Sequence, residues 1–288
     1  MSHSRLRSLQ GLPRELYRRS RVASRARAES RLEPRLRFEH DAPQLLLSPH
    51  WDDAVLSCWN LLERKGELNV VNLFAGIPSP GRAGTWEAVC GARDSSERAR
   101  TRIAEDARAL ARAGREPLGL ALLDAKYRGR RADVDLNALD RALSEAVPSA
   151  SRVYVPAGIG AHPDHVSARD YGRLLLRSGM PVTLYAELPY CIFHGWPSWV
   201  DGSPPVPTRN VDAYWQSFLA GVPEMPALRS ADVQRLHGSA SVAKLEAIQC
   251  YETSLNYSVK RLLADPALHG FEVHWRLTGP AADSSPAA

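Results

Sequence analysis

The chain alternates short apolar runs with stretches of helical character, and this alternation restricts its possible folds more than any other feature. Strands are predicted at residues 44–48, 68–75, 118–123, 152–156, 181–187 and 271–277. Apolar runs of this length are typical of strands buried on both faces of a parallel sheet. The pattern therefore predicts an α/β fold with a mainly parallel sheet and helices on both faces.

Helical stretches separate these predicted strands. They cover residues 53–65, 94–113, 136–147, 165–178 and 242–257. Gly66 and Gly114 follow the first two, in the position that glycine favours at a helix end. In sheets of this kind the reactive groups gather beyond the carboxyl ends of the strands. Polar residues directly after a strand are therefore the first candidates for a functional site.

Composition divides the chain into an arm, one domain and a tail. We expect residues 1–40 to form a basic N-terminal arm, 41–278 one domain, and 279–288 a disordered tail. Residues 190–240 interrupt the strand–helix alternation and are rich in proline and tryptophan. They predict an irregular, lid-like insertion near the active-site end of the sheet.

The positive charge belongs to the arm. Residues 1–37 hold eleven arginines against three glutamates, so the rest of the chain has a net charge of −3 although the whole has +5. A nucleic-acid-binding domain would carry basic residues on the folded body, so no nucleic-acid partner is expected. The arm fits either a solvated extension or peripheral contact with an acidic membrane or a partner protein.

The cysteines and the hydropathy indicate the compartment. Cys58, Cys90, Cys191 and Cys250 lie far apart in the sequence and form no CxxC pair. They predict free thiols rather than a disulfide framework or a cysteine-rich zinc site. No apolar run approaches the roughly 20 residues that a membrane-spanning helix needs. We expect a cytoplasmic protein.

Two polar motifs follow predicted strands. Ser48-Pro49-His50-Trp51-Asp52-Asp53 follows the first, and Ala161-His162-Pro163-Asp164-His165 follows the fourth. Both motifs are predicted at carboxyl strand ends, where they can meet. Histidine and aspartate are ligand types that zinc accepts, and catalytic zinc sites use three protein ligands and leave one position open. The motifs therefore predict a metal centre with a spare acid beside it.

The motifs, in this order on an alternating chain, resemble the LmbE-like (PIG-L) zinc deacetylases, over roughly residues 44 to 260. The resemblance implies a Rossmann-like fold, one Zn²⁺ per chain and removal of an acetyl group from an N-acetylglucosamine-type sugar. That sugar would belong to a lipid, a thiol precursor or a natural-product glycoside. By motif match, the metal ligands would be His50, Asp53 and His165. The catalytic residues would be Asp52 as general base, His162 stabilising the oxyanion and Asp164 orienting His162.

The implied chemistry is hydrolysis of an acetamide. Zinc would activate the attacking water, and Asp52 would take its proton and return it to the leaving amine. A protonated His162, held in that state by a hydrogen bond to Asp164, would stabilise the negative charge on the carbonyl oxygen.

Five residues are candidates for substrate contacts. Trp51 stands where the family commonly has proline, and predicts either an indole at the pocket mouth or a packed aromatic. Arg102 resembles the arginine of a family R-x-x-E pair with Glu105, or forms a surface ion pair. Asp124 follows the third strand and predicts a hydroxyl contact or a turn cap. Glu187 and Tyr190 end the fifth strand and resemble a family turn.

Two further features stay open. Trp196, Trp199 and Trp215 fit either stacking faces for a sugar or an apolar aglycone, or a small separate core. Lys244, Tyr251 and Ser254 resemble a late family helix, although Leu255 replaces its usual glutamine.

Competing interpretations remain at this point. Two histidines and a carboxylate also suit non-haem iron oxygenases, although the spare Asp52 and the α/β pattern disfavour this. The sequence is also compatible with an amidase acting on a larger N-acyl group or thiol conjugate, and with a non-catalytic glycan-binding homologue.

Overall fold

The structure, a computed structural model, describes residues 32–81, 87, 91–128, 134–193, 195–204 and 208–279. Most of the predicted arm, residues 1–31, and the tail from residue 280 lie outside the described residues. The described part contains a seven-stranded sheet in the order β4-β3-β2-β6-β7-β9-β8. The mixed α/β fold, with helices around a mainly parallel sheet, confirms the predicted class.

The strands of this sheet, except β8, lie close to the predicted apolar runs. They are β2 (Gln44–Ser48), β3 (Leu68–Asn72), β4 (Pro117–Gly119), β6 (Val153–Pro156), β7 (Val182–Tyr185), β8 (Asp232–Arg235) and β9 (Phe271–Arg276). Neighbours among β4, β3, β2, β6 and β7 pair in parallel, whereas β9 pairs antiparallel with both β7 and β8. A short separate pair joins β1 (Arg37–Phe38) to β5 (Ser149–Ala150).

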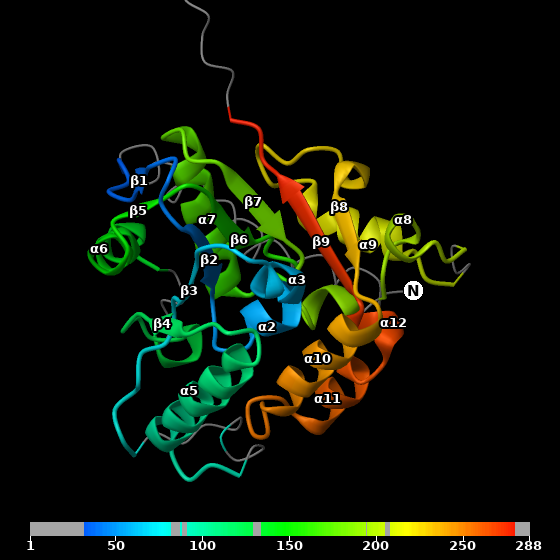
Figure 1. The fold of residues 1–288 in the computed structure, drawn as a ribbon, viewed down its shortest axis with the longest axis horizontal. Helices are drawn as coiled ribbons and strands as arrows, with labels where there is room; N and C mark the ends of the chain where they lie inside the picture. Colours follow the sequence, from blue (N-terminus) through cyan, green and yellow to red (C-terminus); the bar gives the residue numbers. More distant parts are fainter. Residues whose placement is uncertain are drawn as a thin grey trace, which may run out of the picture.

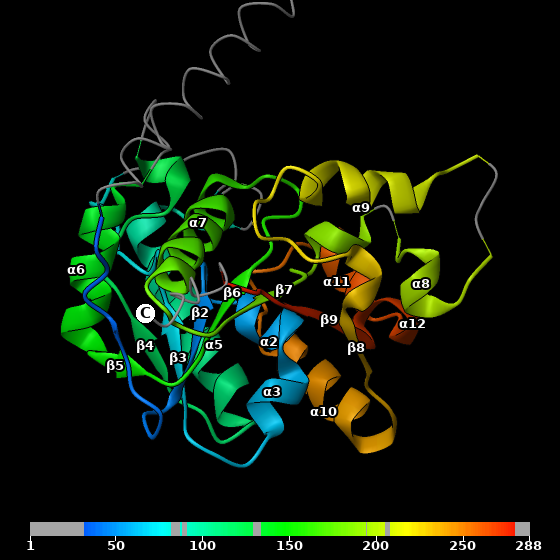
Figure 2. The ribbon, with the colours of Figure 1, turned by 90° about the horizontal axis from the view of Figure 1, so that it is seen from above.

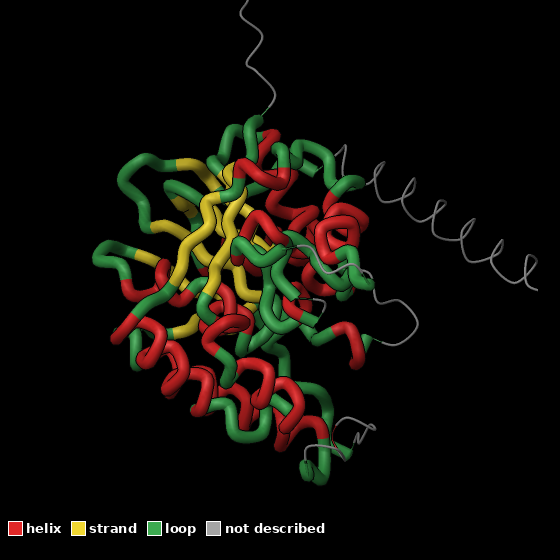
Figure 3. The backbone as a smooth tube through the Cα atoms, turned by 90° about the vertical axis from the view of Figure 1, so that its right-hand side faces the viewer, coloured by secondary structure: helices red, strands yellow, loops and turns green. Residues whose placement is uncertain are grey.

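Helices lie on both sides of the sheet (Figures 1 and 3). They are α2 (Asp53–Ser57), α3 (Trp59–Glu63), α5 (Ser95–Ala111), α6 (Leu136–Ala146), α7 (Pro163–Arg177), α8 (Ser198–Asp201), α9 (Val211–Leu219), α10 (Gly238–Gln249), α11 (Tyr257–Leu263) and α12 (Pro266–His269). Figure 2 shows α6 and α7 on one side of the sheet, and α2, α3 and α10 on the other.

Strand β6 illustrates why both faces are covered. Val153 and Val155 are fully buried, and they lie on the side of the strand that faces α7. Gly172 of α7 makes this contact possible, because a Cβ there would lie 2.7 Å from a methyl carbon of Val155. Helix and strand therefore pack at the short distance that glycine permits, which fixes the start of α7 beside the end of β6.

The order of the strands creates a switch point between β2 and β6. From β2 the chain moves outward through β3 and β4, and it then crosses back to pair β6 with the other edge of β2. Connections leave β2 and β6 in opposite directions, which opens a crevice beyond their carboxyl ends. The two polar motifs follow these two strands.

Three boundaries differ from the predictions. Leu36 is buried and β1 pairs with β5, so the folded body begins before residue 41. The predicted helix over 53–65 is interrupted at Cys58, because the Glu272 carboxylate accepts the backbone N–H groups of Trp59 and Asn60 and starts a new helix there. The predicted helix over 242–257 instead runs over Gly238–Gln249 as α10.

The tryptophans of residues 190–240 form a packed aromatic cluster with the sheet. Trp215 is fully buried, and its ring lies 5.5 Å from that of Trp196, 5.9 Å from that of Trp199 and 6.4 Å from that of Trp275 in β9. The indole N–H of Trp196 donates to the Leu268 carbonyl. Of the two predicted alternatives, the packed core describes these tryptophans better than exposed faces that stack on a sugar or an aglycone. The segment also supplies the unpredicted edge strand β8.

Within the described ranges, no helix combines the length and the apolar character that crossing a membrane requires.

Candidate metal centre and active site

The turn between β2 and α2 carries the first motif and is closed by its own side chains. The Ser48 hydroxyl donates to the His50 carbonyl and accepts from the Ala54 N–H. The Asp53 carboxylate accepts the His50 N–H at 2.9 Å. These bonds hold the side chains of His50 and Asp53 on the same side of the turn, at the carboxyl end of β2.

The loop between β6 and α7 carries the second motif and turns sharply. Gly158, Gly160 and Ala161 all have positive φ angles, between 57° and 82°. Gly160 also has no room for a side chain, since a Cβ would lie 3.0 Å from the ring of Tyr190. His162 caps α7, and Pro163 opens its first turn, where proline is well tolerated. This brings His165 back over the end of β6.

The predicted ligands His50, Asp53 and His165 come together. His50 Nδ1 is 3.4 Å from Asp53 Oδ2, His165 Nε2 is 3.3 Å from the same oxygen, and the two ring nitrogens are 3.3 Å apart. Zinc bonds of about 2.0–2.1 Å in a tetrahedron place ligand atoms about 3.3–3.4 Å apart. The three donor atoms therefore have the chemistry and the spacing of a tetrahedral zinc site.

Each histidine also contacts a carboxylate through its other ring nitrogen. His50 Nε2 is 3.0 Å from Asp164 Oδ2, and His165 Nδ1 is 3.4 Å from Glu187 Oε1. Asp164, His165 and Glu187 are completely buried. A carboxylate on the far nitrogen is the usual partner of a metal-bound histidine, because it fixes the tautomer and the ring orientation. This second feature supports the fit to a metal ion.

The carboxylates around His50 also favour a positive charge at this position. Burial alone would lower the pKa of His50, but hydrogen bonds to Asp164 and Asp53 raise it to about 10. The ring thus holds a positive charge between carboxylates, a role that a divalent cation would take over. A looser grouping of His50, His162 and His165 has donor atoms within 4.8 Å of one another. We favour the set with Asp53, whose spacings match tetrahedral zinc.

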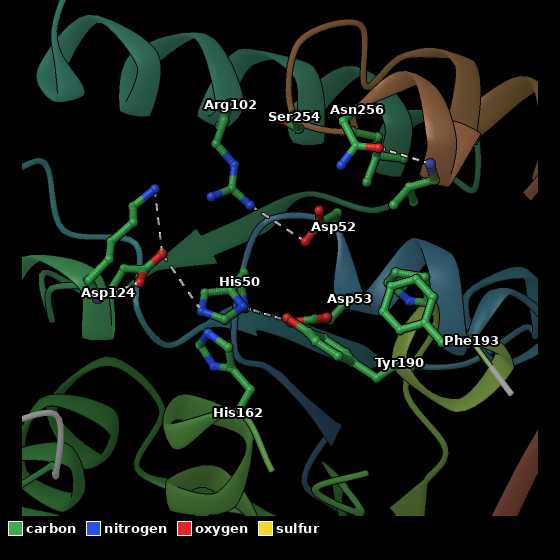
Figure 4. Close-up of a pocket in the computed structure, with 14 residues that line it drawn as sticks. His50, Asp52, Asp53, Arg102, Asp124, His162, Tyr190, Phe193, Ser254 and Asn256 are labelled. Carbon is green, nitrogen blue, oxygen red and sulfur yellow. Dashed lines mark hydrogen bonds and ion pairs between the residues drawn. The ribbon is translucent and has the colours of Figure 1, made fainter. Parts of the chain in front are cut away.

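Asp52 points into the cavity beside the ligands (Figure 4). It is partly buried, and Arg102 Nη2 lies 3.6 Å from its Oδ1. Burial raises the pKa of Asp52, while Arg102 opposes this rise. Because these two effects on its pKa oppose each other, the Asp52 carboxylate can accept a proton and return it. This property suits the predicted general base.

Trp51 does not line this cavity. Its ring is buried against Ala75, Ala99 and Ile103, and the Arg102 guanidinium lies over it at 4.9 Å. The prediction of a substrate contact at the pocket mouth is wrong, and the packed-aromatic alternative is correct. The indole instead supports Arg102, which does line the cavity.

The predicted hydrogen bond between the side chains of His162 and Asp164 is replaced by a different arrangement. His162 Nδ1 accepts the backbone N–H of Asp164 at 3.3 Å. The Asp164 side chain instead contacts His50 and Arg128 and accepts the Ala125 N–H. Asp164 therefore orients His50 rather than His162.

The electrostatics of His162 also differ from the prediction. Burial, with the neighbouring His50 and His165, lowers its pKa to about 4. Since Nδ1 accepts a hydrogen bond, the proton of the neutral ring is on Nε2. The structure thus presents a neutral N–H donor where a protonated imidazole was predicted.

The cavity has a volume of about 330 Å³ and two chemically different sides. Its polar side includes three predicted residues, Asp52, Arg102 and Asp124, and it also includes Lys126. Its apolar side comprises Pro189, Tyr190, Phe193, Leu255 and Val259. Tyr190, which was also predicted to contact the substrate, lies with its ring centroid 5.1 Å from that of His165. A sugar-sized group fits such a space.

Glu187 and Glu105 have other roles than those predicted. Glu187 is fully buried behind His165, so the prediction of a substrate contact is wrong. Glu105 does not pair with Arg102. Its carboxylate accepts from the backbone N–H and hydroxyl groups of Thr253 and Ser254. It thereby holds the loop that carries Leu255 into the cavity wall.

Lining residues that were not predicted include Lys126, Phe193, Asn256 and Val259. Lys126 had a usable signal, since it lies two residues after Asp124 at the end of the third predicted strand. The other three come from the end of 3-10 helix η2 (Tyr190–Ile192) and from α11 with its cap, and no local pattern marks them as site residues.

Comparison with known proteins agrees with this site. Residues 45–175 match the family described as PIG-L: GlcNAc-PI de-N-acetylase. The matched segment runs from β2 into α7 and includes all three candidate ligands. The match covers a little under half of the chain.

A particular relative is 2'-N-acetylparomamine deacetylase from Streptomyces fradiae. It is 32% identical over 166 residues, which covers 51% of this chain and 57% of the relative. The chain thus spans little more than half the length of this relative.

Solved structures extend the likeness over the whole fold. The A40926 pseudoaglycone deacetylase has a TM-score of 0.61 and 26% identity, covering 85% of this chain and 100% of that one. A deacetylase of the teicoplanin biosynthetic pathway has a TM-score of 0.62 and 23% identity, covering 83% of this chain and 99% of that one. The likeness to the deacetylase of the teicoplanin pathway shows a common fold.

Proposed function

We propose that the chain is a zinc-dependent N-deacetylase that removes an acetyl group from an N-acetylglucosamine-type sugar of a larger glycoconjugate. One observation carries the proposal: His50, Asp53 and His165 present three donor atoms at tetrahedral spacing, and the acid Asp52 lines the same cavity beside them. The family match and the deacetylase relatives support the same reaction.

His50, Asp53 and His165 would hold the metal. Zinc in such a site supplies Lewis acidity, which lowers the pKa of water and polarises an amide carbonyl. Asp164 and Glu187 fix the orientation of the two histidines from behind. Because these carboxylates are buried, they hold the rings without competing for the substrate.

Asp52 would move the proton in hydrolysis. The oxygen of water forms a bond to the acetamide carbon, and the C–N bond breaks to give acetate and a free amine. The water proton passes to the Asp52 carboxylate and then to the departing nitrogen. The Arg102 guanidinium, 3.6 Å away, keeps Asp52 ionised enough to accept the proton.

His162 would stabilise the carbonyl oxygen as negative charge develops on it. Its Nδ1 is occupied by the backbone N–H of Asp164, so Nε2–H is available as a fixed donor. A preorganised neutral donor lowers the barrier because it needs no reorientation during the reaction. Asp124 and Lys126 would contact sugar hydroxyl groups.

The apolar side of the cavity suggests what the sugar is attached to. Phe193, Leu255 and Val259 lie opposite the polar side chains, and Phe193 is 45% exposed. Such a wall fits the apolar aglycone of a natural-product glycoside. It also favours a second candidate, an amidase for longer N-acyl chains.

The test is a panel of acylated substrates with the zinc-loaded chain. The probes are 2'-N-acetylparomamine, an N-acetylglucosaminyl pseudoaglycone, N-acetylglucosaminyl-phosphatidylinositol, and the same pseudoaglycone with an N-decanoyl group. We expect release of free amine with equimolar acetate, loss on chelation and recovery with zinc. Faster release from the N-decanoyl compound would favour the second candidate. Iron content with oxygen uptake, or no amine release from any probe, would overturn the hydrolase.

A further inference from the structure

A second, smaller cavity lies at the opposite end of the sheet from the metal centre. It has a volume of about 220 Å³ and is lined by residues of β2, β6, β7, β8 and β9 and by Arg64, which follows α3. The pairing register places Tyr154 opposite Thr183, and Thr183 opposite Arg276. Paired residues point to the same face of a sheet, so these side chains project together toward α3.

The cavity is polar where a sheet face would normally be apolar. Tyr154, Thr183 and His274 are each at least nine-tenths buried, yet all three line it. The Tyr154 hydroxyl donates to Gln44, and the contact of His274 with the Cys58 thiol is as long as 4.0 Å. These buried polar side chains have partners within the protein, so the cavity is a polar space built into the face of the sheet.

The charge of the cavity is unbalanced. Arg64, Arg152 and Arg276 line it together with a single acid, Asp232. Asp232 accepts from the Gln234 amide, and within the described residues none of the three guanidinium groups forms an ion pair. The excess is two positive charges.

All three arginines lie close enough to Tyr154 for their charges to act on its hydroxyl, although Arg64 and Arg276 are exposed residues and Arg152 is partly buried. Burial raises the pKa of Tyr154, and the positive charges of Arg152, Arg64 and Arg276 oppose this rise. Arg152 also donates to the Thr183 hydroxyl at 3.4 Å. Three like charges around one cavity repel each other, less strongly where solvent screens them, and an anion between them would relieve this repulsion.

We propose that this cavity is a binding site for a dianionic phosphate group, either free or at the end of a small phosphate ester. Guanidinium groups bind phosphate oxygens through paired N–H donors. The Thr183 hydroxyl adds a neutral contact at the base of the cavity. The excess of two positive charges matches a dianion, and the volume admits a phosphate with a small substituent. The site is separate from the proposed deacetylase centre and does not depend on it.

The test is calorimetric titration of the zinc-loaded, full-length chain with inorganic phosphate, glucose 6-phosphate and glucose. We expect both phosphates to bind and glucose not to bind. The variant Arg152→Gln/Arg276→Gln should weaken phosphate binding at least tenfold. A tighter complex with glucose 6-phosphate would identify an ester as the ligand, and equal affinities would identify the phosphate group alone.

Two control variants show whether the phosphate binds in this cavity or elsewhere on the chain. Arg141→Gln/Arg261→Gln removes the same charge from exposed positions of α6 and α11 and should leave the affinity unchanged. Arg102→Gln tests binding at the metal centre and should also leave it unchanged. Without phosphate, Arg152→Gln/Arg276→Gln should unfold at the wild-type temperature or above it, because repulsion is relieved. Unchanged phosphate affinity in that variant, or equal loss in either control, would overturn the proposal.

Discussion

Asp164 Oδ2 lies 3.0 Å from Nε2 of His50, on the opposite side of the ring from the contact between His50 Nδ1 and Asp53. His50 is thus held between two carboxylates that come from different motifs. One carboxylate belongs to the proposed ligand set, and the other sets the direction of the ring. The relationship makes Asp164 a positioning residue for the metal centre, and it leads to a first prediction.

Asp164→Asn should weaken zinc binding about 10- to 100-fold, the usual effect of losing a carboxylate behind a metal-bound histidine. Competition with a chromogenic chelator measures this affinity. Asp170→Asn is a matched control, since it is on the same helix and its carboxylate accepts from Arg169 instead. Equal zinc affinities in wild type and Asp164→Asn would contradict the role.

Asp52→Asn should retain zinc and lose about two to four orders of magnitude in kcat, the typical contribution of a general base. The amide keeps the size of the side chain but cannot accept the proton. Zinc content by atomic absorption and amine release under saturating substrate measure the two effects separately. Turnover close to wild type in a fully zinc-loaded variant would refute the assignment.

Phe193→Ser should raise KM about tenfold for glycosides with an apolar aglycone and leave kcat unchanged. Losing a partly buried phenyl contact removes binding that is the same in the ground and transition states. The same change should not affect a methyl glycoside. Phe38→Ser is the matched control, because Phe38 is similarly exposed but lies in β1. A uniform loss on both substrates would argue against an aglycone contact.

Asp106 should give the stability a distinct pH dependence. Burial raises its pKa to about 8, although hydrogen bonds from Tyr251 and Asn72 lower it. Between the unfolded value near 4 and this folded value, the folded chain holds a proton that the unfolded chain has lost. The contribution of Asp106 to the free energy of unfolding is therefore complete below about pH 4. It decreases by about 1.4 kcal/mol per pH unit until about pH 8.

Asp106→Asn removes this titration and gives a direct comparison. Urea unfolding of both proteins at pH 5, 6, 7 and 8 should show wild type losing stability relative to the variant at each step. A constant difference over this range would mean that Asp106 is ionised throughout in the folded protein.

The sequence predicted those parts of the fold that depend on local patterns. Strands β2, β3, β6 and β7 follow from apolar runs, and α5 and α7 from their periodicity and caps. The edge strand β8 has no apolar run and forms because its backbone pairs with β9. The break at Cys58 depends on Glu272, more than 200 residues away. Neither feature has a local signal.

The same distinction applies to the site. Ligand type and strand-end position mark the two motifs in the sequence, and the assignment of His50, Asp53 and His165 as ligands rests on the resemblance of these motifs to the family. The contact between Asp164 and His50 was not predicted. The two residues are 114 positions apart, and the sequence does not reveal which histidine a carboxylate contacts over that separation. Glu187 was predicted to contact substrate because strand ends usually face the cavity, but it points into the protein behind His165.

The aromatic cluster around Trp215 has a consequence for how such a protein can diversify. The described part of residues 195–231 packs against β9 through the rings of Trp196, Trp199 and Trp215, while the candidate ligands and the carboxylates behind them all lie before residue 188. The segment can therefore lengthen, shorten or be exchanged without disturbing the cation site. The aromatic packing of this segment and the cation site are then separately mutable parts of one chain.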